Sequence, residues 1–229
     1  MNNWDFFTNM INNPALRGPL WEAIVETMQM LVISGLATVI LGLPLGVVLF
    51  VVRPGGMAEN RLSHIIMSSI IVNNVRSFPY AILMVSLIPL TRILVGTAVG
   101  PIAASVSLSI ASIPFFARLV ETALNDVHAG KIDAAHAMGS TRFQTIAKVL
   151  IPEAMPTLIA GVTTTLVTIV GYSAMAGLIG GGGLGRLAYN YGYQRYQLDV
   201  MLVTVVLLII IVQLIQLIGD RMSQATDHR

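Results

Sequence analysis

The sequence predicts an all-α polytopic membrane protein with five transmembrane helices, and three observations support this fold class. Hydrophobic residues make up 55% of the 229 residues and charged residues only 10%, against about 25% charged in an ordinary soluble domain. The mean hydropathy is +0.78, and the charges are separated by long uncharged intervals. A soluble fold of this length would need more polar side chains to cover its surface, so that class is excluded.

The uncharged intervals locate the spans, because a helix needs about 20 largely apolar residues to cross a bilayer. Four intervals are long enough, and a fifth span must extend back past Arg76 to cross a hydrocarbon core of about 30 Å. Since a charge within the hydrocarbon is costly, we expect Arg76 to face an interface or a wet cavity. The expected spans are about residues 21–52, 65–91, 93–117, 157–179 and 199–219 of a single domain, residues 1–229.

The basic residues between the spans predict the orientation of the chain. Lys and Arg are enriched in cytoplasmic loops, and most of them fall on the side that holds the C-terminus. We therefore expect the N-terminus outside and the C-terminus in the cytoplasm. The aromatic residues Trp4, Phe6, Phe7 and Trp21 then suit an aromatic belt at the outer face, or the anchors of a short surface helix.

Several kinds of site are excluded by the residues themselves. The chain has no cysteine, which excludes disulfides, thiolate metal sites and cysteine nucleophiles. The four histidines, His64, His128, His136 and His228, lack the spacing of metal ligands. The basic residues form no patch that would suit nucleic acid. We expect no catalytic residue, no metal and no cofactor bound by this chain.

Two glycine patterns bear on nucleotide binding. Gly180, Gly182 and Gly185 formally satisfy the dinucleotide fingerprint, but they follow a spanning helix and not a strand of a βαβ unit. A flexible or tightly packed turn at the outer face is the interpretation that fits this context. No GxxxxGK[ST] motif occurs, so the chain cannot bind ATP phosphates as a P-loop does.

The one long polar connection covers residues 118–153, and a loop of this length is expected to be structured. Residues 131–138 suit a helix with Asp133 in its first turns, where a carboxylate is favoured by the helix dipole. Gly139 suits the left-handed residue that ends such a helix.

A second helix is expected directly after this glycine. Thr141 and Gln144 have the spacing of a capping box, and Pro152 is expected to end the helical pattern. The sequence therefore predicts a helix-turn-helix element at the cytoplasmic surface, where it presents a compact knob to a partner.

The residues of this element resemble the EAA motif of the permease subunits of binding-protein-dependent ABC importers. In that motif, Glu-Ala-Ala is followed by Gly after three residues, by Ile after nine more, and by Leu-Pro after one more. In this chain the spacing is the same, with Asp133 in place of the Glu, Val149 in place of the Ile and Ile151 in place of the Leu. In the family, the motif forms the coupling helix that sits in a groove of a separate ATPase subunit. The resemblance implies ATPase coupling by Asp133, Ala134, Ala135, Met138, Gly139, Ser140 and Pro152. An amphipathic helix lying on lipid headgroups is the alternative.

Four further segments resemble the permeases of bacterial methionine importers, a subfamily with five spans. They are residues 51–55, 74–79, 170–175 and the glycine-rich run from 182 through 193. The resemblance implies a type I importer permease fold in the bacterial cytoplasmic (inner) membrane. It also implies a homodimer, two ABC ATPase subunits that use ATP and Mg, and an extracytoplasmic substrate-binding protein or lipoprotein that delivers L- or D-methionine.

The expected activity is alternating access, with no bond chemistry in this chain. Tyr172, Ser173 and Met175 interrupt the aliphatic run of the fourth span, so we expect the translocation pathway or gate beside them; a packing role for Met175 is equally open. The alternative within the same class is an ABC permease for another amino acid or small solute, and the alternatives from other classes are an intramembrane enzyme and a passive channel. The spans contain almost no ionisable groups for an enzyme, and the chain lacks the charged rings of a channel.

Overall fold

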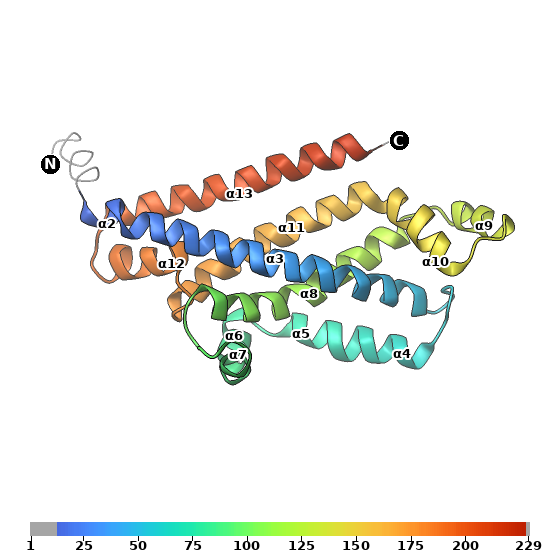
Figure 1. Ribbon diagram of the computed structural model, residues 1–229, viewed down its shortest axis with the longest axis horizontal. Coiled ribbons are helices and arrows are strands. Elements are labelled where there is room, and N and C mark those ends of the chain that lie inside the picture. The colour runs from blue at the N-terminus through green and yellow to red at the C-terminus, as the bar shows by residue number, and fades with distance from the viewer. Residues whose placement is uncertain (1–12, 228–229) are drawn as a thin grey trace. The chain divides into compact units, whose positions relative to one another are not determined.

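The computed structural model describes residues 13–227 and is helical almost throughout that range, without a strand (Figure 1). Four helices within it are long and apolar enough to cross a membrane. The expected belt residues Trp4, Phe6 and Phe7, and also His228, lie outside the described residues. The elements are α2 (Pro14–Arg17), α3 (Pro19–Val52), α4 (Arg61–Ile65), the π-helix η1 (Ile66–Asn73), α5 (Asn74–Ser77), α6 (Tyr80–Ser86), α7 (Ile88–Val95), α8 (Pro101–Asn125), α9 (Ala129–Ala137), α10 (Arg142–Thr145), the π-helix η2 (Ile146–Leu150), α11 (Ile151–Leu178), α12 (Gly183–Leu187), the π-helix η3 (Ala188–Tyr193) and α13 (Leu198–Thr226).

These elements form two compact units. Within the described range, unit 1 contains residues 13–36, 79–110 and 166–215, and unit 2 contains residues 37–78, 111–165 and 216–227. The four long helices α3, α8, α11 and α13 each contribute residues to both units.

Unit 2 is built around a close contact of α3 with α8. An added Cβ at Gly46 would lie 2.5 Å from the Cβ of Val120, and one at Gly42 would lie 2.9 Å from the ring of Phe116. Small residues four positions apart let membrane helices approach each other in this way. Phe50, Phe116 and Val120 are fully or almost fully buried in the resulting core.

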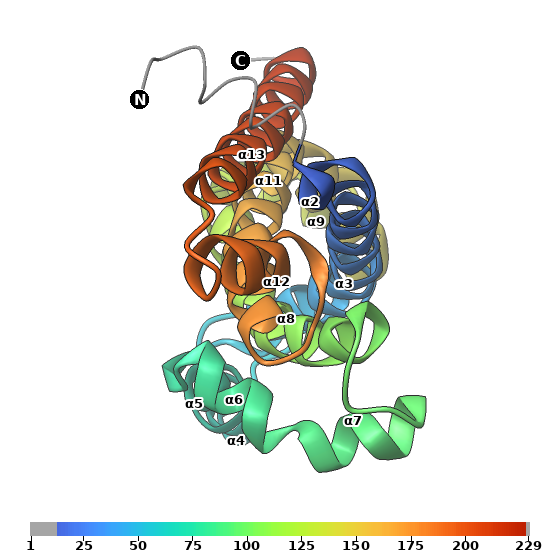
Figure 2. The same ribbon diagram turned by 90° about the vertical axis from the view of Figure 1, so that its left-hand side faces the viewer.

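Unit 1 has its own apolar core near the start of α3. Ala15, Ala23, Leu184, Leu187 and Val200 are its buried members and come from α2, α3, α12 and α13. The short helices α6 and α7 of this unit follow each other with a break between them, as Figure 2 shows. Leu87 separates them, and its backbone (φ −87°, ψ −1°) lies at the edge of the right-handed helical region.

The second expected span, residues 65–91, is not one helix. The chain is helical from Arg61 to Ser77 through the π-helix η1, breaks at Phe78 and Pro79, and resumes as α6 and α7. The break has a local cause: the residue before a proline is disfavoured in the helical region, and Phe78 is extended (φ −75°, ψ 130°). The boundary between the two units passes through this break.

The third expected span also differs, because α8 covers Pro101–Asn125 and not residues 93–117. Gly96 (φ +80°) and Gly100 (φ +95°) adopt left-handed backbone that ends α7 and precedes α8, and proline suits the first position of a helix. The helix continues past the charges that mark the expected start of the loop at residue 118. It does so because Arg118 pairs with Glu121 (2.7 Å) and Leu124 is buried in unit 2.

Candidate functional site

The first part of the candidate site is α9, which follows the end of α8 in unit 2. Its N-cap is His128, whose Nδ1 accepts a hydrogen bond from the Gly130 N–H (3.1 Å). The helix therefore begins at Ala129, earlier than expected, and Asp133 lies in its middle. The helix begins two residues before the expected start at Lys131, so Asp133 lies in the second turn and not in the first, where the helix dipole favours a carboxylate most.

The turn after α9 has the predicted geometry. Gly139 is left-handed (φ +78°), and its N–H donates to the His136 carbonyl (2.9 Å). The Ser140 N–H donates to the carbonyl of Ala135 (3.1 Å). The Ser140 hydroxyl donates to the same carbonyl (2.7 Å) and lies 2.8 Å from the hydroxyl of buried Thr145. Ser140 therefore joins the end of α9 to α10.

The second helix begins with the predicted capping box. The Gln144 N–H donates to Thr141 Oγ1 (3.3 Å), and the Thr141 N–H donates to Gln144 Oε1 (2.9 Å). The prediction that Pro152 ends this helix is wrong, because the helical run extends from Arg142 to Leu178. The π-helix η2 explains the difference: the Ile151 N–H donates to the Ile146 carbonyl, five residues back. This wider winding accommodates the proline ring without the clash that occurs in a regular α-helix.

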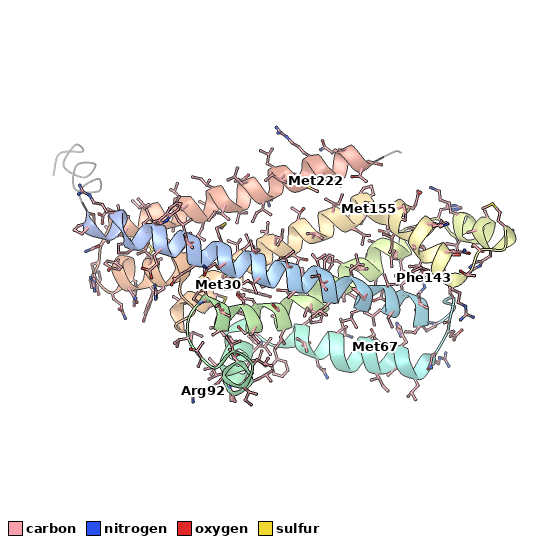
Figure 3. The ribbon with its side chains drawn as sticks, viewed as in Figure 1. Met30, Met67, Arg92, Phe143, Met155 and Met222 are labelled. Atoms are coloured by element: carbon pink, nitrogen blue, oxygen red, sulfur yellow. The ribbon has the colours of Figure 1, made fainter. Side chains whose placement is uncertain are left out.

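The helix-turn-helix element presents two large apolar side chains to the outside. Met138 is 81% exposed and Phe143 is 77% exposed, and Figure 3 labels Phe143 on α10. Ala135 is buried at 2% exposure, whereas Asp133 and Ala134 are exposed. Among the EAA-like residues, Ala135 and Ser140 therefore hold the element together, and Asp133, Ala134 and Met138 form its surface.

An ion pair attaches this element to the rest of unit 2, and a groove lies beside it. Lys131 of α9 forms an ion pair with Glu153 of α11. Beside α9, a groove of about 310 Å³ separates the helix from the turn that follows α3. Its polar lining includes Arg53, Asp133 and His136. Asp133 thus lines this groove together with the cationic Arg53, and it remains exposed.

The three expected pathway residues lie in unit 1 but in different surroundings. The Tyr172 ring stacks on Tyr80, with centroids 4.4 Å apart. Ser173 is buried at 2% exposure, and its hydroxyl donates to the Val170 carbonyl (2.8 Å). Met175 is 40% exposed. Ser173 and Met175 therefore lie on different faces of α11, and the structure does not bring them together.

The glycine-rich turn before α12 is held by residues that the sequence reasoning missed. Glu26 Oε2 accepts a hydrogen bond from the Gly183 N–H (2.6 Å), and Thr27 Oγ1 accepts one from the Leu184 N–H (2.9 Å). Arg186 lies 3.2 Å from the same carboxylate. Glu26 is the last charged residue before the uncharged run of α3, and this position is the one feature of the sequence that points to its role. The turn is tightly packed, as one of the two expected alternatives stated.

The histidines also occupy separate surroundings. His64 lies 3.9 Å from Glu121, His128 caps α9, and His136 lines the groove beside α9. No cluster of three metal-ligating side chains occurs among residues 13–227.

The family of this chain follows from a comparison with family models. Residues 30–229 match the family described as "Binding-protein-dependent transport system inner membrane component". The chain belongs to this family. The match confirms the resemblance carried by the EAA-like motif, and it identifies the chain as a membrane-embedded transport subunit of an ABC importer, which is not itself an enzyme.

Similar members of the inner membrane component family have been named for methionine. A probable D-methionine transport system permease protein MetI of Vibrio cholerae is 48% identical over 210 residues, which are 92% of this chain and 93% of that protein. The methionine import system permease protein MetP of Bacillus subtilis is 46% identical over 210 residues, 92% of this chain and 94% of that protein.

Solved structures confirm the fold. A chain from the inward-facing MetNI methionine ABC transporter superposes with a TM-score of 0.91 at 45% identity, covering 94% of this chain and 100% of that one. A chain from an amino acid ABC transporter superposes with a TM-score of 0.77 at 17% identity, which shows the shared fold alone. The predicted fold class, an all-α ABC importer permease, is therefore confirmed.

Proposed function

We propose that this chain is the transmembrane permease of an ATP-driven importer that moves methionine across the bacterial inner membrane by alternating access. The observation that carries this proposal is the helix-turn-helix of α9 and α10, which presents Met138 and Phe143 to a partner. The substrate is supported by the names of relatives that are 46–48% identical over nearly the whole chain.

The partner of the helix-turn-helix is an ABC ATPase subunit, one for each permease of a homodimer. A short helix with exposed apolar anchors suits a groove on another protein. The turn is rigid enough to transmit force, since Ser140 joins its two helices through hydrogen bonds of 2.7 and 2.8 Å. ATP and Mg belong to the ATPase, because this chain has no P-loop motif.

The pathway lies along α11 between two copies of the chain. Met175 is the candidate gate because it is a large, flexible and 40% exposed side chain on a spanning helix. Tyr172 supports the same region through its stack on Tyr80. Ser173 is buried, so its contribution is the packing of α11 and not contact with the substrate.

The five spans and their orientation are part of this proposal. The segment from α4 to α7 serves as the second span in broken form, with the four long apolar helices as the others. An extracytoplasmic substrate-binding protein then meets the side that holds the N-terminus.

We predict that a single cysteine at Ser140 labels only from the cytoplasmic side, and cysteines at Thr97 and Asn190 only from outside. Labelling of the Ser140 cysteine by an impermeant reagent on intact cells would contradict the orientation.

The test of function is uptake into proteoliposomes that contain the permease and its ATPase, supplied with the substrate-binding protein and ATP. The expected result is ATP-dependent uptake of L-methionine, with D-methionine and other amino acids measured alongside. ATP-dependent uptake of a different amino acid would keep the transport class and refute the substrate. Uptake without the ATPase would indicate a passive channel.

A further inference from the structure

The turn between η3 and α13 exposes an unusual group of side chains in unit 1. Tyr193 is 63% exposed and Tyr196 is 85% exposed, and Gln194 and Arg195 between them are also exposed. We call residues 193–196 the tyrosine–arginine turn. Nothing in the pathway or in the ATPase-coupling element accounts for it.

Tyr196 has a backbone conformation that needs an explanation. Its φ is +53°, and it is the one non-glycine residue with a positive φ among residues 13–227. A side chain in this region is strained, and such strain is commonly found at functional positions. Glycine would relieve the strain, yet the position carries a large aromatic ring that is almost fully in solvent.

The backbone on both sides holds this conformation. The Gln194 N–H donates to the Tyr189 carbonyl (2.9 Å), and the Gln197 N–H donates to the Tyr191 carbonyl (3.1 Å). The Gln197 side chain in turn accepts from Asn13 (3.4 Å). The ring of Tyr196 is therefore projected from a fixed turn and not from a loose one.

Arg195 is positioned in a similar way. Its guanidinium lies 4.4 Å from the centre of the Tyr191 ring, a contact that orients the charge and leaves its N–H donors available. No carboxylate of residues 13–227 forms an ion pair with it. The nearby Asp199 instead accepts a hydrogen bond from Asn13 (2.7 Å). The turn thus offers an oriented cation that an acidic group can neutralise.

We infer that the tyrosine–arginine turn is a docking point for the substrate-binding protein, which contributes a carboxylate to Arg195 and a pocket to Tyr196. Tyr and Arg are, with Trp, the residues enriched at the energetic centres of protein interfaces, and both are held in place here before the partner arrives. The inference rests on the proposed function, because the orientation of the chain decides which partner meets this turn.

An aromatic belt at the bilayer surface is the other role for exposed tyrosines. The structure favours a protein partner, because anchoring in headgroups requires no particular backbone conformation. The residues next to Tyr196 are also polar, namely Arg195 and Gln197, and the apolar run of α13 begins only after Asp199.

The test uses the permease–ATPase complex in nanodiscs, titrated with the fluorescently labelled substrate-binding protein of the same system. Tyr196→Gly removes the ring and suits the positive φ, so the turn is retained. The expected result is a loss of affinity of about thirtyfold for Tyr196→Gly and about tenfold for Arg195→Ala. For Arg195→Ala the remaining binding should also depend less on salt. Trp21→Ala is the matched control, since Trp21 is a 68% exposed aromatic residue of the same unit.

The basal ATPase rate should be unchanged in all three variants. Affinity for the substrate-binding protein within twofold of wild type in Tyr196→Gly would overturn the inference. An equal loss in Trp21→Ala would also overturn it, by assigning both residues to bilayer anchoring. Failure of the wild-type complex itself to bind the substrate-binding protein would refute the proposed function, and the inference with it.

Discussion

Substitution of Gly139 by valine tests the coupling element most directly. Gly139 has φ +78°, and the turn around it is closed by the hydrogen bonds from Gly139 to His136 (2.9 Å) and from Ser140 to Ala135 (3.1 Å). A side chain at this φ is strained, so the chain can relieve the strain only by opening these bonds. Opening them would displace the exposed Met138 next to the turn.

The size of the effect follows from the surroundings of the glycine. Nothing lies within 4 Å of a Cβ added at Gly139, so no steric clash contributes and the backbone strain acts alone. That strain is about 1–2 kcal/mol for an ordinary side chain, which corresponds to a shift of about 5- to 30-fold in the population of the native turn. Valine lies at or above the upper end, because its Cβ is branched.

The assay measures ATPase recovery on the purified permease and the ratio of solute imported to ATP hydrolysed. For Gly139→Val we expect normal membrane insertion and dimerisation, because the spanning helices are elsewhere. ATPase binding should fall by about 5- to 30-fold, or hydrolysis should continue without import. Gly139→Asn is the control, since asparagine tolerates the left-handed region, and it should retain most coupling. Wild-type ATPase recovery and wild-type import in Gly139→Val would refute the assignment of this turn as the coupling element.

Three further predictions concern the long helices and the glycine-rich turn before α12. Gly185→Ala should lower the melting temperature of the purified permease, because the added Cβ would overlap the Ala174 carbonyl and such overpacking costs about 1–3 kcal/mol or more. Gly171→Ala is the control, since its Cβ would lie in open space, and it should leave the melting temperature unchanged. Glu26→Ala should lower the melting temperature by removing the acceptor of the Gly183 N–H and the partner of Arg186, a loss of about 1–3 kcal/mol. An unchanged melting temperature would contradict the conclusion that Glu26 holds the glycine-rich turn. Met175→Ala should raise the basal ATPase rate or the leak of solute, while the yield of the complex stays at the wild-type level. A wild-type basal rate and wild-type leak in that complex would refute the assignment of Met175 as the gate.

Features set by neighbours in the sequence could be predicted without the structure. The uncharged runs require a membrane, because apolar side chains of this number have no other place to be buried. Gly139 and the Thr141–Gln144 capping box depend on residues within a few positions, and the structure has both as predicted. The EAA-like spacing led to the correct family for the same reason, since it lies within one short element.

Features set by contacts between distant residues required the tertiary structure. Glu26 meets Gly183 across a separation of 157 positions, and no local pattern encodes that contact. Pro152 lies within a continuous helical run because a π-helix precedes it, although its local preference is to end a helix. The burial of Ser173 and the exposure of Met175 were likewise decided by packing. Sequence composition determined that this chain enters the membrane, whereas packing of its helices determined which side chains remain available to the substrate and to partners.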